Sequence, residues 1–155
     1  MFNVIIDTRE KKPWTFDSCA SIKGTINRKL DTGDYAVEGL EKVLCIERKE
    51  SVSEIATNIT TSRFEKELMR MSDFEYKFLI LEFDYYHIDI YPEGSDIPKH
   101  KWKMVKTRGP YIMRRLSEIA VKYDIHVIAC SNASYANHIA INLMKRVWEI
   151  KQTKP

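Results

Sequence analysis

The sequence predicts an α/β fold in which a central mixed β-sheet is flanked by α-helices. Of its 155 residues, 44% are hydrophobic and 30% are charged, a composition typical of one folded domain. Short apolar runs of strand length occupy the first 50 residues, and helical and strand-like patterns alternate after them. Successive strand-helix-strand steps need crossover connections, which place helices on the faces of the sheet. We therefore expect a single domain over residues 1–155.

The first third of the chain is expected to form four strands. Phe2–Ile6 is a short apolar run that ends in Asp7, as buried strands often do. The other three expected strands are 22–30, 34–37 and 43–49, separated by glycine-containing turns, and their order suggests a hairpin-like meander. Residues 11–21, which include Pro13 and Trp14, are expected to be a loop or a broken helix.

Two helices are expected to follow, because two capping patterns lie close together. Residues 51–54 and 62–65 both read Ser-x-x-Glu, in which the serine and the glutamate satisfy free backbone groups of a first turn. The β-branched pair Thr60-Thr61 lies between them. We therefore predict two short helices rather than one continuous helix.

The second half alternates between strands and helices around one irregular stretch. Residues 76–83 contain a continuous apolar run typical of a central strand, and residues 125–130 are expected to be another buried strand. Gly109-Pro110 opens a helix, and a last helix is expected over 133–150 with Ile139, Leu143, Val147 and Ile150 facing inward. Residues 84–108 are expected to be an inserted or extended loop segment, in which residues 87–91 alternate like a short edge strand.

Several classes of protein are excluded by composition and by absent motifs. No run approaches the ~20 apolar residues that span a bilayer, and charges interrupt the N-terminus before a signal-peptide core can form, so we expect a cytoplasmic protein without a membrane partner. Cys19, Cys45 and Cys130 are too scattered for a disulfide framework or a zinc site and are expected to be reduced thiols. A phosphate-binding P-loop, a dinucleotide fingerprint and serine or cysteine nucleophile motifs are absent.

Charge is unevenly distributed although the net charge is only +3. Residues 78–98 carry five carboxylates and no Lys or Arg, whereas residues 97–117 carry seven cations and no carboxylate. Such a basic block attracts phosphates by releasing counterions, and a tryptophan within it can stack on bases. A solvated face that pairs with its acidic neighbour is the alternative. The candidate DNA contacts in this block are Lys99, Lys101, Trp102, Lys103, Lys106 and Arg108.

The pattern with most chemical content is Asp34, followed one strand later by Glu47 and Lys49. Side chains two apart on a strand share a face, so Glu47 and Lys49 project together while Arg48 points away. Two carboxylates beside a lysine suit metal-dependent phosphodiester hydrolysis, with Mg²⁺ held by Asp34 and Glu47 and with Lys49 neutralising charge on the phosphate. A strand end with alternating surface charges is the alternative, because short motifs have high false-positive rates.

Five sequence blocks in the same order resemble the motifs of the XPF-type structure-specific endonucleases, which belong to the PD-(D/E)XK nuclease superfamily. Any one of them is a weak signal, but the ordered set is specific. The blocks are Ile6-Asp7-Thr8-Arg9-Glu10, Thr32-Gly33-Asp34-Tyr35, Ile46-Glu47-Arg48-Lys49, Arg63-Phe64-Glu65-Lys66-Glu67-Leu68 and Phe78-Leu79-Ile80-Leu81-Glu82.

The resemblance implies a restriction-endonuclease-like core and a Mg²⁺- or Mn²⁺-dependent DNA endonuclease that cuts branched DNA such as flaps and forks, in DNA repair or recombination. Carried over to matching positions, it implies that Asp7, Asp34 and Glu47 are catalytic and metal-binding residues and that Lys49 is the catalytic lysine. It also implies that Arg9 and Arg48 are site residues and that Arg63 lies near the scissile phosphate.

Two departures from the family pattern leave alternatives open. The family continues the Glu-Arg-Lys motif with an aspartate at the position that Ser53 occupies, and Glu54 follows as a possible replacement. The helix-hairpin-helix module often attached to such nucleases is expected to be absent, so branch recognition is expected to come from this domain, a homodimer or a protein partner. The alternatives are a non-catalytic nuclease-like DNA-binding or dimerisation subunit and a general interaction module. By analogy alone, a small solitary nuclease suits a phage or prokaryotic source.

Overall fold

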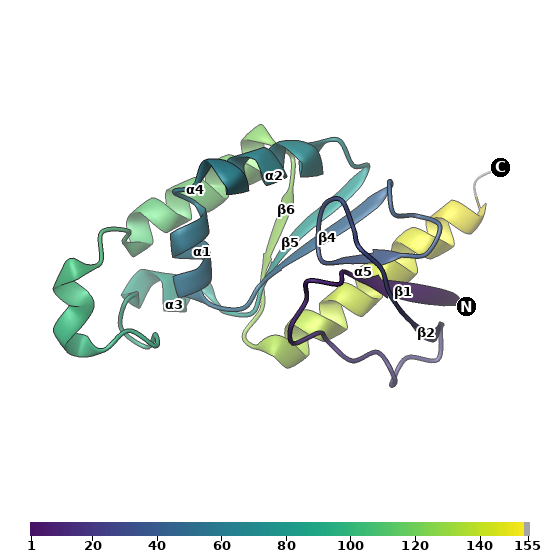
Figure 1. Ribbon diagram of the computed structural model, residues 1–155, viewed down its shortest axis with the longest axis horizontal. Helices are drawn as coiled ribbons and strands as arrows, with labels where there is room; N and C mark the ends of the chain where they lie inside the picture. Colours follow the sequence, from purple (N-terminus) through teal and green to yellow (C-terminus); the bar gives the residue numbers. More distant parts are fainter. Residues whose placement is uncertain (154–155) are drawn as a thin grey trace.

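A computed structural model describes residues 1–153 as a six-stranded mixed sheet with helices on both faces (Figure 1). The single domain expected over residues 1–155 includes residues 154–155, which lie outside the described part. The elements in chain order are β1 (Phe2–Ile6), β2 (Ile22–Asn27), β3 (Tyr35–Val37), β4 (Leu44–Lys49), α1 (Val52–Asn58), α2 (Ser62–Ser72), β5 (Tyr76–Leu81), α3 (Tyr85–Ile90), the 3-10 helix η1 (Lys99–Met104), α4 (Gly109–Lys122), β6 (His126–Ala129) and α5 (Ala133–Thr153).

The order of the strands across the sheet is β2-β1-β3-β4-β5-β6. Strand β3 is antiparallel to both of its neighbours, whereas the β1–β2, β4–β5 and β5–β6 pairs are parallel. The expected meander was therefore wrong for β2, which lies at the sheet edge beside β1. A parallel pair needs a long connection, and residues 7–21 supply it by returning the chain to the starting end of β1.

Two hydrophobic clusters lie on opposite faces of the sheet. Phe78 and Ile80 point to the face covered by α5, and Leu79 and Leu81 point to the face covered by α1, α2 and α4 (Figure 1). The loop after β1 also contributes to the α5 side, because its Trp14 and Phe16 are buried there. The continuous apolar run of β5 is thus explained by a strand that is covered on both faces.

Two local expectations differ from the structure, one at α3 and one at the start of α2. Residues 87–91 are not an edge strand but belong largely to α3, where the backbone N–H of Asp84 donates to Nδ1 of His87 (3.0 Å) and Ile88 is buried. The first residue of α2 is Ser62, and Thr61 is its cap because the Thr61 hydroxyl accepts from the Phe64 backbone N–H (3.2 Å). The cap of α2 thus lies one position before the serine that the sequence pattern indicates, because adjacent hydroxyl residues compete for the same role.

The buried stripe of α5 is also offset from the expected one. Ile139 is 36% exposed, and the inward positions nearby are the small residues Ala136 and Ala140, followed by Met144 and Val147. Alanine leaves room for the helix backbone to approach the sheet, so the pattern of large apolar residues misplaced the face by one position.

The cysteines agree with another expectation. Cys45 and Cys130 are buried free thiols, Cys19 is a half-buried one, and burial raises the pKa of Cys45 and of Cys130. Within residues 1–153, none of the helices combines the length and the apolar character that crossing a membrane requires.

Candidate active site

Three neighbouring strands bring acidic side chains to one edge of the sheet. Asp7 follows the carboxyl end of β1, Asp34 precedes the amino end of β3, and Glu47 and Lys49 lie at the carboxyl end of β4. Because β3 is antiparallel to both neighbours, these positions meet at the same edge. Residues that are far apart in sequence thereby face one cleft.

Gly33 makes the close approach of Asp34 to β4 possible. Its φ is +87°, and a Cβ at this position would lie 2.6 Å from Sγ of Cys45 and 3.1 Å from the carbonyl oxygen of Ile46. The Asp34 backbone N–H donates to the Ile46 carbonyl (2.8 Å), and the Asp34 carbonyl accepts from the Asp7 N–H (2.9 Å). The backbone of Asp34 is thus fixed between β1 and β4.

The cleft has a volume of about 330 Å³ and lies between the sheet edge and helices α1 and α2. Asp34, Glu47 and Lys49 form its sheet side, while Arg63 and Glu67 of α2 line it from the other side. The further lining residues are Asp7, Arg9, Asp31, Thr32, Gly33, Glu54, Asn58, Thr61, Phe64 and Arg70. Carboxylates at the base and arginines at the rim give the cleft an uneven distribution of charge.

The two central carboxylates are destabilised in their charged forms. Burial raises the pKa of Asp34 to about 7, against the opposing hydrogen bond from the Arg48 backbone N–H, and the charges of Glu10 and Glu67 add to the rise. Burial, together with the charges of Asp34 and Glu67, holds the pKa of Glu47 well above its usual range. Such a pair favours any cation that can lie between its members.

Lys49 supplies a positive charge on the same face as Glu47. Its Nζ lies 3.3 Å from Oε1 of Glu47 and 5.0 Å from the centre of the Phe64 ring. Burial alone would lower the pKa of Lys49, but the surrounding carboxylates, led by Glu47 and Glu54, raise it overall. Lys49 is therefore charged at neutral pH and acts as a cation rather than as a base.

The residues present fit a hard divalent cation. Oε2 of Glu47 is buried and finds no hydrogen-bond partner among the residues that the structure describes, although the side chain is almost fully enclosed. Within residues 1–153, no group of three or more His, Cys, Asp and Glu side chains forms a complete metal site. Mg²⁺ needs no such cage, because it keeps several waters and binds through one or two carboxylates, and Asp34 and Glu47 are the two that would hold it.

Asp7 lies in the cleft, where both of its carboxylate oxygens accept hydrogen bonds, and its metal-binding role stays a prediction. Its Oδ1 accepts from the Leu30 backbone N–H (2.8 Å), and its Oδ2 accepts from Nε (2.7 Å) and the backbone N–H (3.2 Å) of Arg9. Burial would raise the pKa of Asp7, but these hydrogen bonds lower it overall. Oδ2 thus holds Arg9 at the rim, Oδ1 holds the Leu30 backbone, and Arg9 also donates to the Leu30 carbonyl (2.8 Å).

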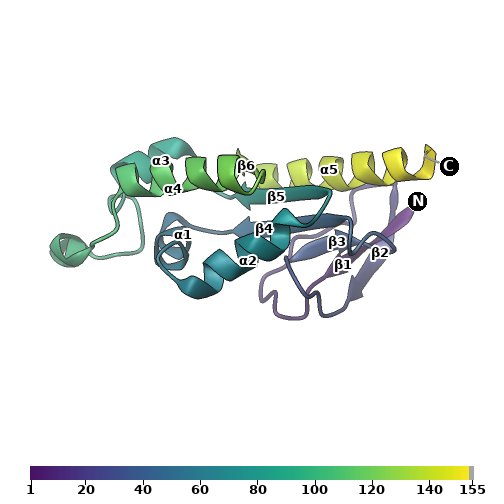
Figure 2. The ribbon, with the colours of Figure 1, turned by 90° about the horizontal axis from the view of Figure 1, so that it is seen from above.

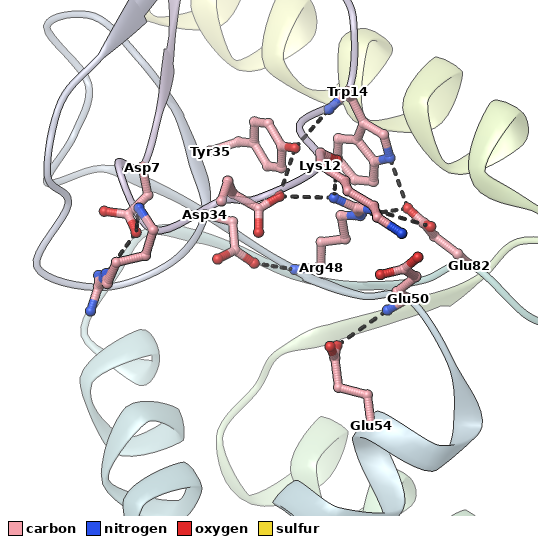
Figure 3. Close-up of polar contacts among 11 residues, drawn as sticks. Asp7, Lys12, Trp14, Asp34, Tyr35, Arg48, Glu50, Glu54 and Glu82 are labelled. Carbon is pink, nitrogen blue, oxygen red and sulfur yellow. Dashed lines mark hydrogen bonds and ion pairs between the residues drawn. The ribbon is translucent and has the colours of Figure 1, made fainter. Parts of the chain in front are cut away.

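Arg48 is directed away from the cleft, as strand alternation predicts. Figure 3 shows its guanidinium beside Glu82 and Trp14, and Arg48 does not line the cleft. Nε donates to Glu82 (2.6 Å), and one terminal nitrogen donates to Glu10 (2.9 Å) and to the Lys12 carbonyl (2.7 Å). The Arg48 side chain is therefore a structural anchor, and its backbone N–H, which donates to Asp34 (2.8 Å), contributes to the site.

The structure distinguishes the two candidates for the missing aspartate of the family pattern. Glu54 lines the cleft, and its Oε1 accepts from the Glu50 backbone N–H (3.2 Å; Figure 3). Ser53 faces a neighbouring hollow, where its hydroxyl donates to Asp96 (2.9 Å). Of the two residues, Glu54 is the one placed to replace the aspartate.

Two cleft residues on α2 were missed by the sequence reasoning. Glu67 and Arg70 lie four and seven positions after Arg63, so all three share one face of the helix. Nε of Arg70 also donates to the Thr32 hydroxyl (3.2 Å) beside the glycine turn. Helical spacing from Arg63 was the signal that could have identified them.

The remaining candidate DNA contacts do not line the cleft. Lys99, Lys101 and Lys103 are exposed on η1, while Lys106 and Arg108 are exposed just after it. Trp102 is half-buried, and its Nε1 donates to the Ile97 carbonyl (2.8 Å), so its role is largely internal packing. Of the predicted DNA-binding residues, Arg63 alone is brought to the cleft.

Comparison with known proteins agrees with this arrangement. A family model described as the ERCC4 domain matches residues 6–143. The structure of XPF from Aeropyrum pernix is similar, with a TM-score of 0.66 and 18% identity over 97% of this chain and 69% of that one. A complex of XPF from Aeropyrum pernix with DNA also has a TM-score of 0.66, with 17% identity over 96% of this chain and 66% of that one. A search of curated proteins found no match.

Proposed function

Because the chain belongs to the ERCC4 domain family, we propose that it is a Mg²⁺- or Mn²⁺-dependent endonuclease that hydrolyses phosphodiester bonds of DNA, at branched structures such as flaps and forks. The observation that carries the proposal is the convergence of Asp34, Glu47 and Lys49 in one cleft, with a buried Glu47 oxygen that lacks a partner among the described residues. The DNA complex of the similar archaeal protein supports DNA as the substrate class.

The carboxylates, the lysine and the arginines of the cleft have different roles in this chemistry. Asp34 and Glu47 would hold a divalent cation, which when bound would supply a Lewis acid that lowers the pKa of water and neutralises charge on the phosphate. Lys49, which stays protonated, stabilises the negative charge that develops on the phosphate oxygens during attack. Arg9, Arg63 and Arg70 at the rim provide cations for the phosphates on either side of the cut.

The experiment that tests the proposal is cleavage of labelled flap, fork, four-way junction, duplex and single-stranded DNA with Mg²⁺, Mn²⁺ or EDTA. We expect metal-dependent cutting of the branched substrates, reduced about 100-fold or more in the Asp34→Asn and Lys49→Ala variants. Asp17→Asn, in an exposed loop position outside the cleft, is the matched control and should leave the rate unchanged.

Titration with Mn²⁺ distinguishes the enzyme from a non-catalytic subunit. The enzyme should bind Mn²⁺, and Asp34→Asn should weaken that binding, because it removes one of the two central carboxylates. Branched-DNA binding without cutting and without Mn²⁺ binding would overturn the proposal in favour of the non-catalytic subunit. The substrate ranking tests the branch preference separately from the nuclease activity.

A further inference from the structure

Residues 91–108, which we call the basic arm, project from one end of the molecule beyond α1 and α3 (Figure 2). They begin directly after α3, contain η1 and lead into α4. The arm leaves and rejoins the fold at nearly the same point, because a Cβ on Gly109 would lie 2.4 Å from the carbonyl oxygen of Ile88. The arm is thus a long loop whose two ends lie close together where α3 meets α4.

The arm is held by several internal contacts. Ile97 and Val105 pack against the hydrophobic cluster that α1, α2 and α4 share. Trp102 Nε1 donates to the Ile97 carbonyl (2.8 Å), and Arg108 donates to the Trp102 carbonyl (3.0 Å). Asp96 accepts from the Ser53 hydroxyl of α1 (2.9 Å). These contacts define the direction in which the arm projects.

The cations of the arm are not neutralised by the protein itself. Lys99, Lys101, Lys103, Lys106 and Arg108 are exposed, and none of them takes part in an ion pair within residues 1–153. The carboxylates of the acidic stretch, of which Glu93 and Asp96 belong to the arm itself, therefore do not pair with these cations. Five cations on a projecting element fit a polyanion.

The position of the arm relative to the cleft indicates which polyanion it meets. Helix α1 lies between them, since Glu54 and Asn58 line the cleft while Ser53 contacts the arm. A helix is about 10–12 Å across and duplex DNA advances about 3.4 Å per base pair, so α1 spans at least about three base pairs. A duplex that has its scissile phosphate in the cleft can continue past α1 to the arm.

We propose that the basic arm binds the phosphate backbone of a DNA duplex several base pairs from the cut, an inference that rests on the proposed function of the cleft. Lysine is a flexible point charge that suits phosphates, and phosphate contacts position a protein without reading sequence. The one aromatic side chain of η1, Trp102, is half-buried with its Nε1 engaged. The arm therefore orients duplex flanks and does not stack on bases.

The test is DNA binding in EDTA as a function of salt, compared between two triple variants. Lys99→Ala/Lys101→Ala/Lys103→Ala removes three arm cations, and Lys23→Ala/Lys29→Ala/Lys42→Ala removes three exposed lysines outside the cleft and the arm. The arm variant should lower the slope of log affinity against log salt by about two to three, because each phosphate contact contributes about 0.9. The control variant should leave the slope unchanged.

Modified DNA locates the contact. Methylphosphonates, which are neutral, replace the duplex phosphates from the fourth base pair outward from the cut. They should weaken binding of the wild type more than binding of the arm variant, which keeps only Lys106 and Arg108 of the five arm cations. Equal loss in both triple variants, an unchanged salt slope, or an additive effect of methylphosphonates and the arm variant would overturn the inference. If the wild type binds through the arm yet never cuts DNA, the proposed function fails and the duplex contact stands.

Discussion

Asp34 is a buried carboxylate whose charge is disfavoured by its surroundings until a cation is bound. Burial raises its pKa to about 7, and Glu10 and Glu67 add repulsion. A carboxyl group whose pKa is raised on folding stabilises the protein below the unfolded pKa and loses that contribution as the pH rises through the folded value. The metal-free protein should therefore lose stability between pH about 4 and pH about 7 because of this residue.

Asp34→Asn should remove the loss of stability that occurs as the pH rises. The amide oxygen can still accept the Arg48 backbone N–H, while the repulsion disappears, so we expect the metal-free variant to gain up to about 4 kcal/mol near pH 8, since one pKa unit corresponds to about 1.4 kcal/mol. In a domain of this size each kcal/mol raises the Tm by about 2–4 °C. The measurement is thermal unfolding of both proteins in EDTA from pH 4 to pH 8. A Tm difference that does not grow with pH would contradict the assignment.

At the level of single residues, the sequence predicts which way Glu47, Arg48 and Lys49 face better than it predicts what surrounds them. Alternation along β4 is sufficient to place Glu47 and Lys49 on one face and Arg48 on the other, and the structure agrees. The hydrogen-bond partners of Asp7 could not be predicted, because they depend on Leu30 and Arg9 reaching its two oxygens. That arrangement is set by how the loop before β3 folds back, which no local pattern encodes.

Helix α2 carries one wall of the cleft, so its first turn fixes the position of Arg63. The Thr61 hydroxyl accepts from the Phe64 backbone N–H, whereas Ser62 is the first residue inside the helix. Thr61→Ala should therefore destabilise the protein by about 1 kcal/mol, and Ser62→Ala should change the stability by less than about 0.5 kcal/mol. Urea unfolding of the two variants measures both values. The reverse order would show that the serine is the cap.

At the level of elements, most strands and helices were predicted correctly, whereas one short alternating segment and the place of β2 in the sheet were not. The buried run of β5 and the two helices after β4 were predicted at nearly their observed positions. Helix α3 was not, because an alternating stretch of five residues is compatible with a strand or with one and a half helical turns. The place of β2 at the sheet edge depends on the path of residues 7–21, which tertiary packing of Trp14 and Phe16 determines.

Arg48 connects three parts of the molecule that are distant in sequence. Its guanidinium contacts Glu10 and the Lys12 carbonyl in the loop after β1, and Glu82 immediately after β5. Trp14 joins the same network, since its Nε1 donates to Glu82 (2.8 Å). The network therefore ties the N-terminal loop to the centre of the sheet.

Arg48→Met should cost about 3–5 kcal/mol, because it leaves the buried carboxylate of Glu82 without its cation. Adding Glu82→Gln should recover part of that loss, since the side-chain amide is neutral and can still accept from Trp14. Arg28→Met is the matched control, and it should cost less than about 1 kcal/mol because Arg28 pairs with Glu38 and Glu41 at the surface. Urea unfolding of all three variants checks the prediction. Equal costs for Arg48→Met and Arg28→Met would contradict it.

The Arg48–Glu82 ion pair also bears on the order in which the protein forms during synthesis. Every residue that lines the cleft lies at or before Arg70, so a ribosome that has released the first 70 residues has already released the complete set. Glu82 and strand β5, the partner of β4, are still missing at that stage. The backbone of β4 that carries Glu47, Lys49 and the Asp34 contact is then open on one side. The cleft consequently acquires its final shape only after β5 has been translated and has joined the sheet.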